Sequence, residues 1–221
     1  MKNKYEAVIF DLDGTLLDTA EDLAGSINFM LKTLRFPERS VDEIKAFLGN
    51  GIKNLVLRSL PAKDVPTEIR ERGFALFREH YFAHCEEKTA PYPGILSLLD
   101  RLLAAGIRTA IVSNKNDVPV KALNAKYFGE KIPVAIGENE AAGVKKKPAP
   151  DTVFSALKAL SVSSENSVYV GDSEVDYETA KNAGLPVILV GWGFRKKDAL
   201  LALRPDDFAD TVEELSALLL S

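Results

Sequence analysis

The chain has 221 residues, 46% of them hydrophobic and 27% charged, and its formal net charge is −4. This length suits one large domain, or one domain that carries a smaller insertion. The one compact basic run, at residues 145–147, is too short to form a nucleic-acid-binding surface. No apolar stretch is long enough to cross a bilayer, and the N-terminus does not resemble a signal peptide. We therefore expect a cytoplasmic protein without a membrane segment, in which the single cysteine, Cys85, forms no internal disulfide.

Short apolar runs rich in valine and isoleucine predict buried strands at residues 7–10, 109–112, 134–136, 168–170 and 187–190. Each run is bounded by Gly, Pro, Asp or Ser, and most are separated by helical patterns. Continuous apolar strands that alternate with helices indicate a parallel sheet covered on both faces. We therefore predict the α/β class, with a Rossmann-like parallel sheet as its core.

The segment at residues 17–87 breaks this alternation, because it contains helical patterns and no good strand. Its first helix is predicted from apolar residues at helical spacing: Leu23, Ile27, Met30, Leu31 and Leu34. A capping box at Ser40 and Glu43 opens a second helix. We predict an inserted all-α domain at residues 17–87 and a core domain made of residues 1–16 plus 88–221. Two prolines and a glycine at residues 88–94 suit the returning linker.

Polar clusters follow three of the predicted strands, at residues 11–15, 113–115 and 171–176. Lys147 lies in the loop after the predicted strand at residues 134–136. Because ligands of an open parallel sheet bind outside the carboxyl ends of the strands, we expect these clusters to meet at one edge. Carboxylates brought together repel one another unless a cation neutralises them, and all-oxygen ligands suit Mg²⁺. A lysine and a serine hydroxyl beside the ion could hold phosphate oxygens. The residues alone thus predict a site for a phosphoryl group on magnesium.

These clusters resemble the motifs of the haloacid dehalogenase (HAD)-like hydrolase superfamily, in the same order. The motifs are Asp11-Leu12-Asp13-Gly14-Thr15, then Ser113, then Lys147-Pro148, and then Gly171-Asp172 with Asp176. The resemblance covers essentially the whole chain, and the inserted helices are similar to the small helical cap of that superfamily. Residues 91–94, 112–115 and 147–151, with 48–51 and 191–194, resemble the phosphoglycolate phosphatase branch.

The resemblance implies a covalent mechanism at the first motif. Asp11 is expected to be the nucleophile that attacks phosphorus. Asp13 is expected to act as general acid for the leaving group and then as general base for water. The backbone carbonyl of Asp13 would also bind the metal, which requires a sharp turn that Gly14 allows. Thr15 is expected to help orient Asp13.

The other motifs are implied to bind the phosphoryl group and the metal. Ser113 is expected to donate a hydrogen bond to the phosphoryl oxygens, together with the backbone N–H of Asn114. Lys147 is expected to offset charge on the nucleophile and on the transferring group. Asp172 would bind Mg²⁺ directly, alongside the first motif, and Asp176 would act through a water or as an orienting partner.

The inserted helices offer weaker candidates. In the family, the loop that corresponds to residues 48–51 leans over the site, so Asn50 and Lys53 are candidate substrate contacts. His80 and His84 have a spacing that can bind zinc, but no third ligand is evident, and we interpret them as helix-surface residues. We interpret Trp192 as a packing residue near the sheet edge.

The leading hypothesis is a hydrolase for a small phosphorylated metabolite, with 2-phosphoglycolate as the first substrate to test. An inorganic pyrophosphatase and a β-phosphoglucomutase-type phosphomutase share all the motifs, and the cap decides among them. A haloacid dehalogenase is disfavoured, because it needs no magnesium and lacks the carboxylate of Asp13. A phosphate-holding receiver domain is disfavoured, because here the candidate nucleophile follows the first strand and Asp13 is available for turnover. Both a monomer and a homodimer remain open.

Overall fold

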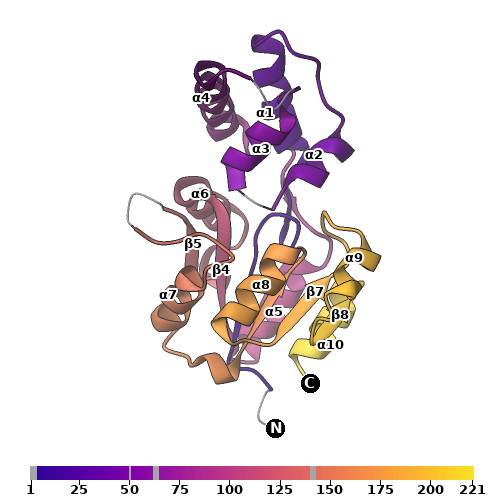
Figure 1. Cartoon of the computed structure of the whole chain (residues 1–221). Coiled ribbons are helices and arrows are strands. Elements are labelled where there is room, and N and C mark those ends of the chain that lie inside the picture. The colour runs from indigo at the N-terminus through magenta and orange to yellow at the C-terminus, as the bar shows by residue number, and fades with distance from the viewer. Residues whose placement is uncertain (1–3, 50, 62–64, 140–142) are drawn as a thin grey trace. The chain divides into compact units, whose positions relative to one another are not determined.

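The computed structural model describes residues 4–49, 51–61, 65–139 and 143–221, and it divides into two compact units (Figure 1). The α/β unit comprises Met1–Leu17 and Pro91–Ser221, and the helical unit comprises Asp18–Ala90. The chain passes between the units through two short strands, β2 (Leu17–Asp18) and β3 (Ala90–Pro91), which pair with each other. The helical unit is therefore an insertion within the chain of the α/β unit.

The α/β unit is built on a six-stranded sheet whose neighbouring strands are all parallel. The strand order is β5 (Val134–Glu138), β4 (Arg108–Asn116), β1 (Ala7–Phe10), β6 (Ser167–Gly171), β7 (Val187–Val190) and β8 (Asp207–Ala209). This architecture confirms the predicted α/β class with a parallel core. The strand β8 was not predicted, because its three residues contain no apolar run.

Helices cover both faces of the sheet, because strand side chains alternate between two apolar clusters. Val8 and Phe10 of β1 belong to one cluster, and Ala7 and Ile9 belong to the other. The first cluster includes residues of α5 (Ile95–Ala104), α6 (Asp117–Tyr127) and α10 (Val212–Leu219). The second includes residues of α7 (Asp151–Leu160), α8 (Glu174–Ala183) and α9 (Lys197–Ala202). Two short 3₁₀ helices, η1 (Gly129–Lys131) and η3 (Ser164–Asn166), precede β5 and β6.

The strand order reverses at β1, since the chain moves from β1 to β4 and β5 on one side and then to β6, β7 and β8 on the other. Such a reversal leaves a crevice outside the carboxyl ends of the central strands. The loops after β1 and β6 therefore open at the same edge as the end of β4. The sequence prediction ended β4 at Val112, but the strand continues to Asn116 and its register with β5 shifts between these two residues.

The described residues of the helical unit form α1 (Ala20–Thr33), α2 (Val41–Phe47), α3 (Gly51–Ser59) and α4 (Thr67–His84). In α1 the predicted apolar positions Leu23, Ile27, Met30 and Leu31 are buried. The predicted capping box opens α2: the Ser40 side chain accepts the Glu43 N–H, and Glu43 accepts the Ser40 N–H at 2.9 Å. These two bonds satisfy donors that a helix start would otherwise leave unpaired.

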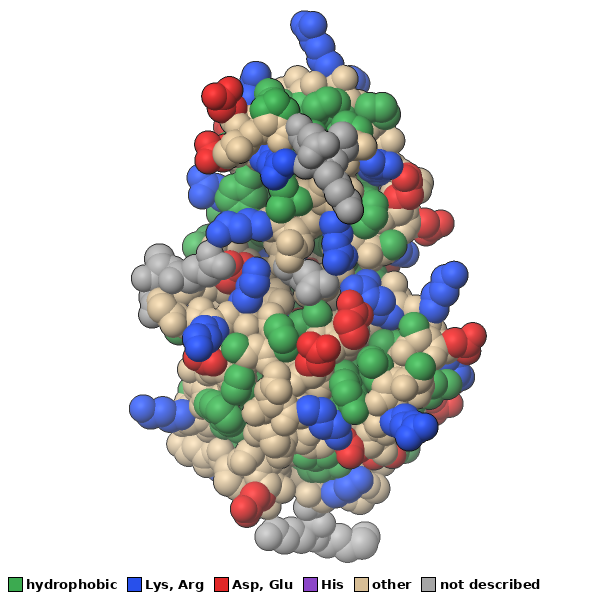
Figure 2. Space-filling view, viewed as in Figure 1, with side chains coloured by type: hydrophobic (Ala, Val, Ile, Leu, Met, Phe, Trp, Pro, Cys, Tyr) green, Lys and Arg blue, Asp and Glu red, His purple; other side chains and the backbone are tan. Residues whose placement is uncertain are grey.

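Charged side chains are mixed in sign on the face drawn in Figure 2. In both units the described lysine and arginine side chains are interspersed with acidic ones on that face and do not gather in one stripe. Within the described part of the chain, no helix is both long and apolar enough to span a membrane.

Candidate active site

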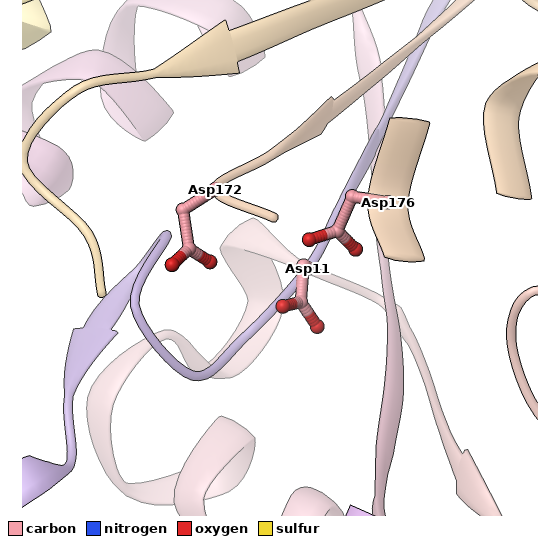
Figure 3. Close-up of side chains that lie close together, drawn as sticks. All are labelled: Asp11, Asp172 and Asp176. Carbon is pink, nitrogen blue, oxygen red and sulfur yellow. The ribbon is translucent and has the colours of Figure 1, made fainter. Parts of the chain in front are cut away.

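Three aspartates meet at the carboxyl ends of the central strands (Figure 3). Asp11 directly follows β1, and its N–H donates to the carbonyl of Val170 in β6 at 2.9 Å. Asp172 follows β6, and Asp176 lies in the first turn of α8. One carboxylate oxygen from each of the three aspartates lies within 4.8 Å of the other two. Their exposed fractions are 8%, 2% and 0%, so the cluster is almost fully withdrawn from water.

Lys147 supplies a positive charge inside this cluster. Its Nζ donates to Asp11 Oδ1 at 2.7 Å and to Asp176 Oδ1 at 2.8 Å, and its side chain is only 3% exposed. The hydroxyl of Tyr169 also donates to Asp176 Oδ1, at 3.0 Å. Tyr169 was missed in the sequence analysis, because it occurs within an apolar strand and follows no motif.

The side chain of Asn114 fixes the backbone of Lys147. Asn114 Oδ1 accepts the Lys147 N–H at 2.8 Å, and Asn114 Nδ2 donates to the Lys147 carbonyl at 3.1 Å. This two-point bond ties the end of β4 to the loop that follows β5. Only the backbone N–H of Asn114 was predicted to have a function, as a donor to phosphoryl oxygens. The anchoring contact of its side chain was not predicted.

The carboxylate of Asp172 is held by two donors from different segments. Thr15 Oγ1 donates to Asp172 Oδ1 at 3.1 Å, and the Phe194 N–H donates to Asp172 Oδ2 at 2.8 Å. The Trp192 indole N–H in turn donates to the Thr15 carbonyl at 3.1 Å. Thr15 was expected to orient Asp13, but its described hydroxyl contact is with Asp172. Trp192 packs beside Tyr92, as expected of a packing residue, and it also secures the first motif.

Two glycines make room for Asp172. A Cβ at Gly14 would lie 2.5 Å from Asp172 Oδ2, and a Cβ at Gly193 would lie 2.3 Å from Asp172 Cβ. Both distances are far inside van der Waals contact. Gly14 also has a φ of +91°, which other residues rarely adopt. The first motif and the loop after β7 can therefore approach this carboxylate only because these positions lack side chains.

Asp176 bonds both to its own helix and to the cluster. Its Oδ2 accepts the Ser173 N–H at 3.1 Å, and its own N–H donates to Ser173 Oγ at 3.3 Å, which forms a capping box at the start of α8; the Ser173 hydroxyl also donates to Oδ2 at 2.6 Å. Its Oδ1 is the atom that faces Lys147 and Tyr169. The helix cap thus orients the carboxylate toward the site.

The three aspartates of the cluster can carry more negative charge than Lys147 alone neutralises. Burial, followed by the nearby charge of Asp176, raises the pKa of Asp11 well above its usual value. The same two causes raise the pKa of Asp172 to about 7. Burial alone would lower the pKa of Lys147, but Asp11 and Asp176 outweigh it and raise that pKa well above its usual value. Three buried carboxylates with all-oxygen donor atoms fit a hard divalent cation.

Asp13 and Ser113 both contact a second buried lysine, Lys115. Lys115 Nζ lies 2.6 Å from Asp13 Oδ1, and the Lys115 N–H donates to Ser113 Oγ at 3.1 Å. Ser113 is buried, whereas the Asp13 side chain is 20% exposed. Lys115 was predicted as part of the polar cluster at residues 113–115, but no role was assigned to it, because the four superfamily motifs include Ser113 and not Lys115. Its contact with Asp13 joins two segments that are far apart in the chain.

The helical unit contains the residues that were considered as substrate contacts or zinc ligands. Asn50 lies outside the described residues, and Lys53 is an exposed residue of α3. The His80 ring bonds to Ser26 Oγ at 3.0 Å and stacks against His84 at a centroid distance of 4.0 Å. Among the described residues, the aspartate cluster of the α/β unit is the group found with metal-binding geometry.

Comparisons with known proteins identify the family to which the chain belongs. The haloacid dehalogenase-like hydrolase family model matches residues 8–190. The chain is 31% identical to a phosphoglycolate phosphatase of Aquifex aeolicus, with 93% of this chain and 96% of that protein covered. It is 35% identical to a plasmid-encoded phosphoglycolate phosphatase of Cupriavidus necator, with coverage of 96% and 92%.

Solved structures show the same similarity over the whole chain. A protein from Lactobacillus delbrueckii subsp. bulgaricus, provisionally described as a phosphoglycolate phosphatase, superposes with a TM-score of 0.91 at 34% identity, covering 98% of this chain and 99% of that one. CbbY from Rhodobacter sphaeroides, crystallised with phosphate, superposes with a TM-score of 0.76 at 29% identity, covering 96% of each chain. The chain belongs to the haloacid dehalogenase-like hydrolase family.

Proposed function

We propose that the chain is a magnesium-dependent phosphatase that hydrolyses a small phosphomonoester, with 2-phosphoglycolate as its first candidate substrate, through an aspartyl phosphate on Asp11. One observation carries the proposal: Asp11 is buried at the reversal of the sheet, paired with Lys147, and clustered with Asp172 and Asp176. The names of the full-length relatives support 2-phosphoglycolate in particular.

Magnesium would be held by the carboxylates of Asp11 and Asp172 and by the backbone carbonyl of Asp13. Asp176, which is fixed by Ser173, would orient this set or act through a water. When bound, the ion would neutralise charge on the phosphoryl oxygens and hold the group against Asp11. Its charge would also compensate for the burial and the Asp176 charge that together raise the pKa of Asp172 to about 7.

In the first step, a carboxylate oxygen of Asp11 attacks phosphorus. The bond between phosphorus and the leaving alcohol oxygen breaks, and Asp13 gives its proton to that oxygen. Lys147 binds Asp11 Oδ1 and so helps to hold the attacking carboxylate in place. Ser113 and the Asn114 N–H would bind phosphoryl oxygens during this step.

In the second step, the Asp13 carboxylate takes a proton from water, and the water oxygen attacks the same phosphorus. The bond between phosphorus and Asp11 breaks, which releases inorganic phosphate and restores the Asp11 carboxylate. Asp13 is left protonated and ready for the next leaving group. The cycle therefore uses one nucleophile and one acid–base residue, both from the first motif.

Several expectations stay predictions within this proposal. These are substrate contact by Asn50 and Lys53, the role of residues 17–87 as a cap, the cytoplasmic location, and the choice between monomer and homodimer. Alanine variants at positions 50 and 53 would test the first of these. A rise in KM for the preferred substrate, with little change for a generic aryl phosphate, would support it.

The experiment that tests the proposal is phosphate release from a substrate panel, with Mg²⁺ and with EDTA. The panel contains 2-phosphoglycolate, pyrophosphate, β-glucose 1-phosphate, several sugar phosphates and p-nitrophenyl phosphate. We expect Mg²⁺-dependent release with the highest kcat/KM for 2-phosphoglycolate. A preference for pyrophosphate would favour the pyrophosphatase, and conversion of β-glucose 1-phosphate without phosphate release would favour the mutase. Absence of release from every member would contradict phosphatase activity.

A further inference from the structure

Lys115 is a second buried lysine beside the reacting groups, and the two-step mechanism above leaves it without a function. Its side chain is 2% exposed, and its Nζ lies 2.6 Å from Asp13 Oδ1. Other lysine–carboxylate pairs on the described surface have lysine side chains that are 32% to 66% exposed. Lys115 therefore resembles Lys147, whose burial accompanies a contact with the proposed nucleophile.

Three consecutive residues at the end of β4 each contact a different part of the site. Ser113 lies where the phosphoryl group is expected, Asn114 anchors the backbone of Lys147, and Lys115 binds Asp13. The register of β4 with β5 shifts between Val112 and Asn116, so these residues lie in an irregular part of the strand. The Lys115 N–H donates to Ser113 Oγ at 3.1 Å, which ties the two ends of this short run together.

A buried ion pair is a costly way to stabilise a protein. Removing charges from water carries a large desolvation penalty, and well-packed apolar residues often stabilise a protein as well or better. Stability therefore gives a weak reason to bury Lys115 against Asp13. Proton transfer gives a stronger one, because an acid–base residue must lie within hydrogen-bond reach of the reacting oxygen.

We propose that Lys115 is a positioning residue for Asp13, which its ammonium group holds in the orientation that serves both proton transfers. This inference rests on the proposed phosphatase function. In both steps the proton moves between Asp13 and an oxygen, of the leaving alcohol or of water, and Lys115 exchanges no proton itself. Loss of the ammonium would let the carboxylate rotate away from both oxygens.

The test compares Lys115→Met with Lys121→Met, a matched control. Lys121 forms an ion pair of the same 2.6 Å length with Asp117, but its side chain is 64% exposed. We expect Lys115→Met to lower kcat for 2-phosphoglycolate roughly 10- to 100-fold, part of the effect typical of general acid–base catalysis, with KM changed less than about twofold. Lys121→Met should match the wild type.

Two further measurements separate positioning from a general structural effect. Because p-nitrophenolate leaves without a proton, Lys115→Met should still release it quickly from p-nitrophenyl phosphate and then stall, which gives a burst equal to the enzyme concentration. In an Asp13→Asn background, Lys115→Met should cause no further loss, since both changes act on the same group. A partly unfolded variant would instead lower burst and steady rate together.

The outcomes distinguish this inference from the function on which it rests. Without Mg²⁺-dependent release by the wild type, the phosphatase proposal fails and this inference fails with it. If the wild type is active and Asp13→Asn is impaired, but Lys115→Met turns over like Lys121→Met, the positioning role is wrong. Losses that multiply in the double variant would also overturn it. Should Lys115→Met not fold, Lys115→Arg keeps the charge but displaces the carboxylate, and it must show the same masking by Asp13→Asn.

Discussion

The two units of the chain bury polar side chains in different ways. In the helical unit, two buried polar side chains bond to the backbone: Asp22 accepts the N–H groups of Lys88 and Thr89, and Ser59 donates to the Leu55 carbonyl. In the α/β unit, buried charged groups face one another, as Lys147 faces Asp11. Bonds of this kind give buried donors and acceptors the hydrogen-bond partners that a stable fold requires. Burial and the neighbouring carboxylate of Asp176 raise the pKa of Asp11 and of Asp172, and such shifts are typical of a site that performs chemistry.

The largest effect is expected for Asp11→Asn. The amide is nearly the same size but is a poor nucleophile, so phosphate release should fall at least about 10³-fold while the fold remains. Turnover of 2-phosphoglycolate and the circular dichroism spectrum check this. A folded variant that keeps more than a tenth of the activity would remove Asp11 from its proposed role.

Gly193→Ala should have the next largest effect, since the new Cβ would lie 2.3 Å from Asp172 Cβ. We expect the Mg²⁺ concentration for half-maximal activity to rise roughly 10-fold, as is typical when the support of a metal ligand is disturbed. Gly25→Ala in α1 is the matched control, because nothing lies within 4 Å of its Cβ. That change should leave activity unaltered and raise the melting temperature slightly. If both variants needed the same Mg²⁺ concentration for half-maximal activity, the proposed disturbance of Asp172 by a Cβ at position 193 would be contradicted.

In EDTA the wild type should lose stability as pH rises, and Asp172→Asn should abolish this loss. Burial raises the pKa of Asp172 from 3.8 to about 7, so between these values the folded state holds a proton that the unfolded state has lost. The free energy of unfolding therefore falls as pH rises through this window, and the penalty is fully present above it. The variant lacks this penalty.

The measurement is the melting temperature of both proteins in EDTA from pH 5 to pH 8. The difference, variant minus wild type, should grow with pH and reach at least about 3 °C, the size expected from roughly 1 kcal/mol in a chain of this length. Added Mg²⁺ should stabilise the wild type more than the variant. A difference that stays constant across the range would contradict the assigned cause.

The smallest effect is expected in the helical unit, for Ser40→Ala. Loss of the capping box should lower the melting temperature by about 2 to 4 °C, because a donor at the start of α2 loses its partner. The kcat should not change. Thermal unfolding and steady-state kinetics check both parts, and a kcat loss larger than about threefold would show that α2 matters to the chemistry.

The sheet was predictable because its strands are continuous apolar runs, and the site was predictable because polar motifs follow their ends. Asp11, Asp172, Asp176 and Lys147 meet as that reasoning expects. The strand β8 was missed, since its pairing with β7 depends on tertiary context rather than on an apolar pattern.

Side-chain partners were less predictable than positions. The Thr15 hydroxyl contacts Asp172, Asn114 anchors the backbone of Lys147, and Lys115 pairs with Asp13. Each contact joins segments far apart in the chain, and a sequence pattern records spacing along the chain but no distance between segments.

The central claim is that phosphate passes through Asp11. Its most direct test is acid quenching of Asp13→Asn during turnover of ³²P-labelled p-nitrophenyl phosphate, whose leaving group needs no proton, followed by peptide mapping. Because Asp13→Asn lacks the base that activates water but can still be phosphorylated by this substrate, the aspartyl phosphate should accumulate, with the label on the peptide that contains Asp11 and none in the Asp11→Asn, Asp13→Asn double variant. Label on another residue, or no protein-bound phosphate while the wild type turns over the same substrate, would contradict the account.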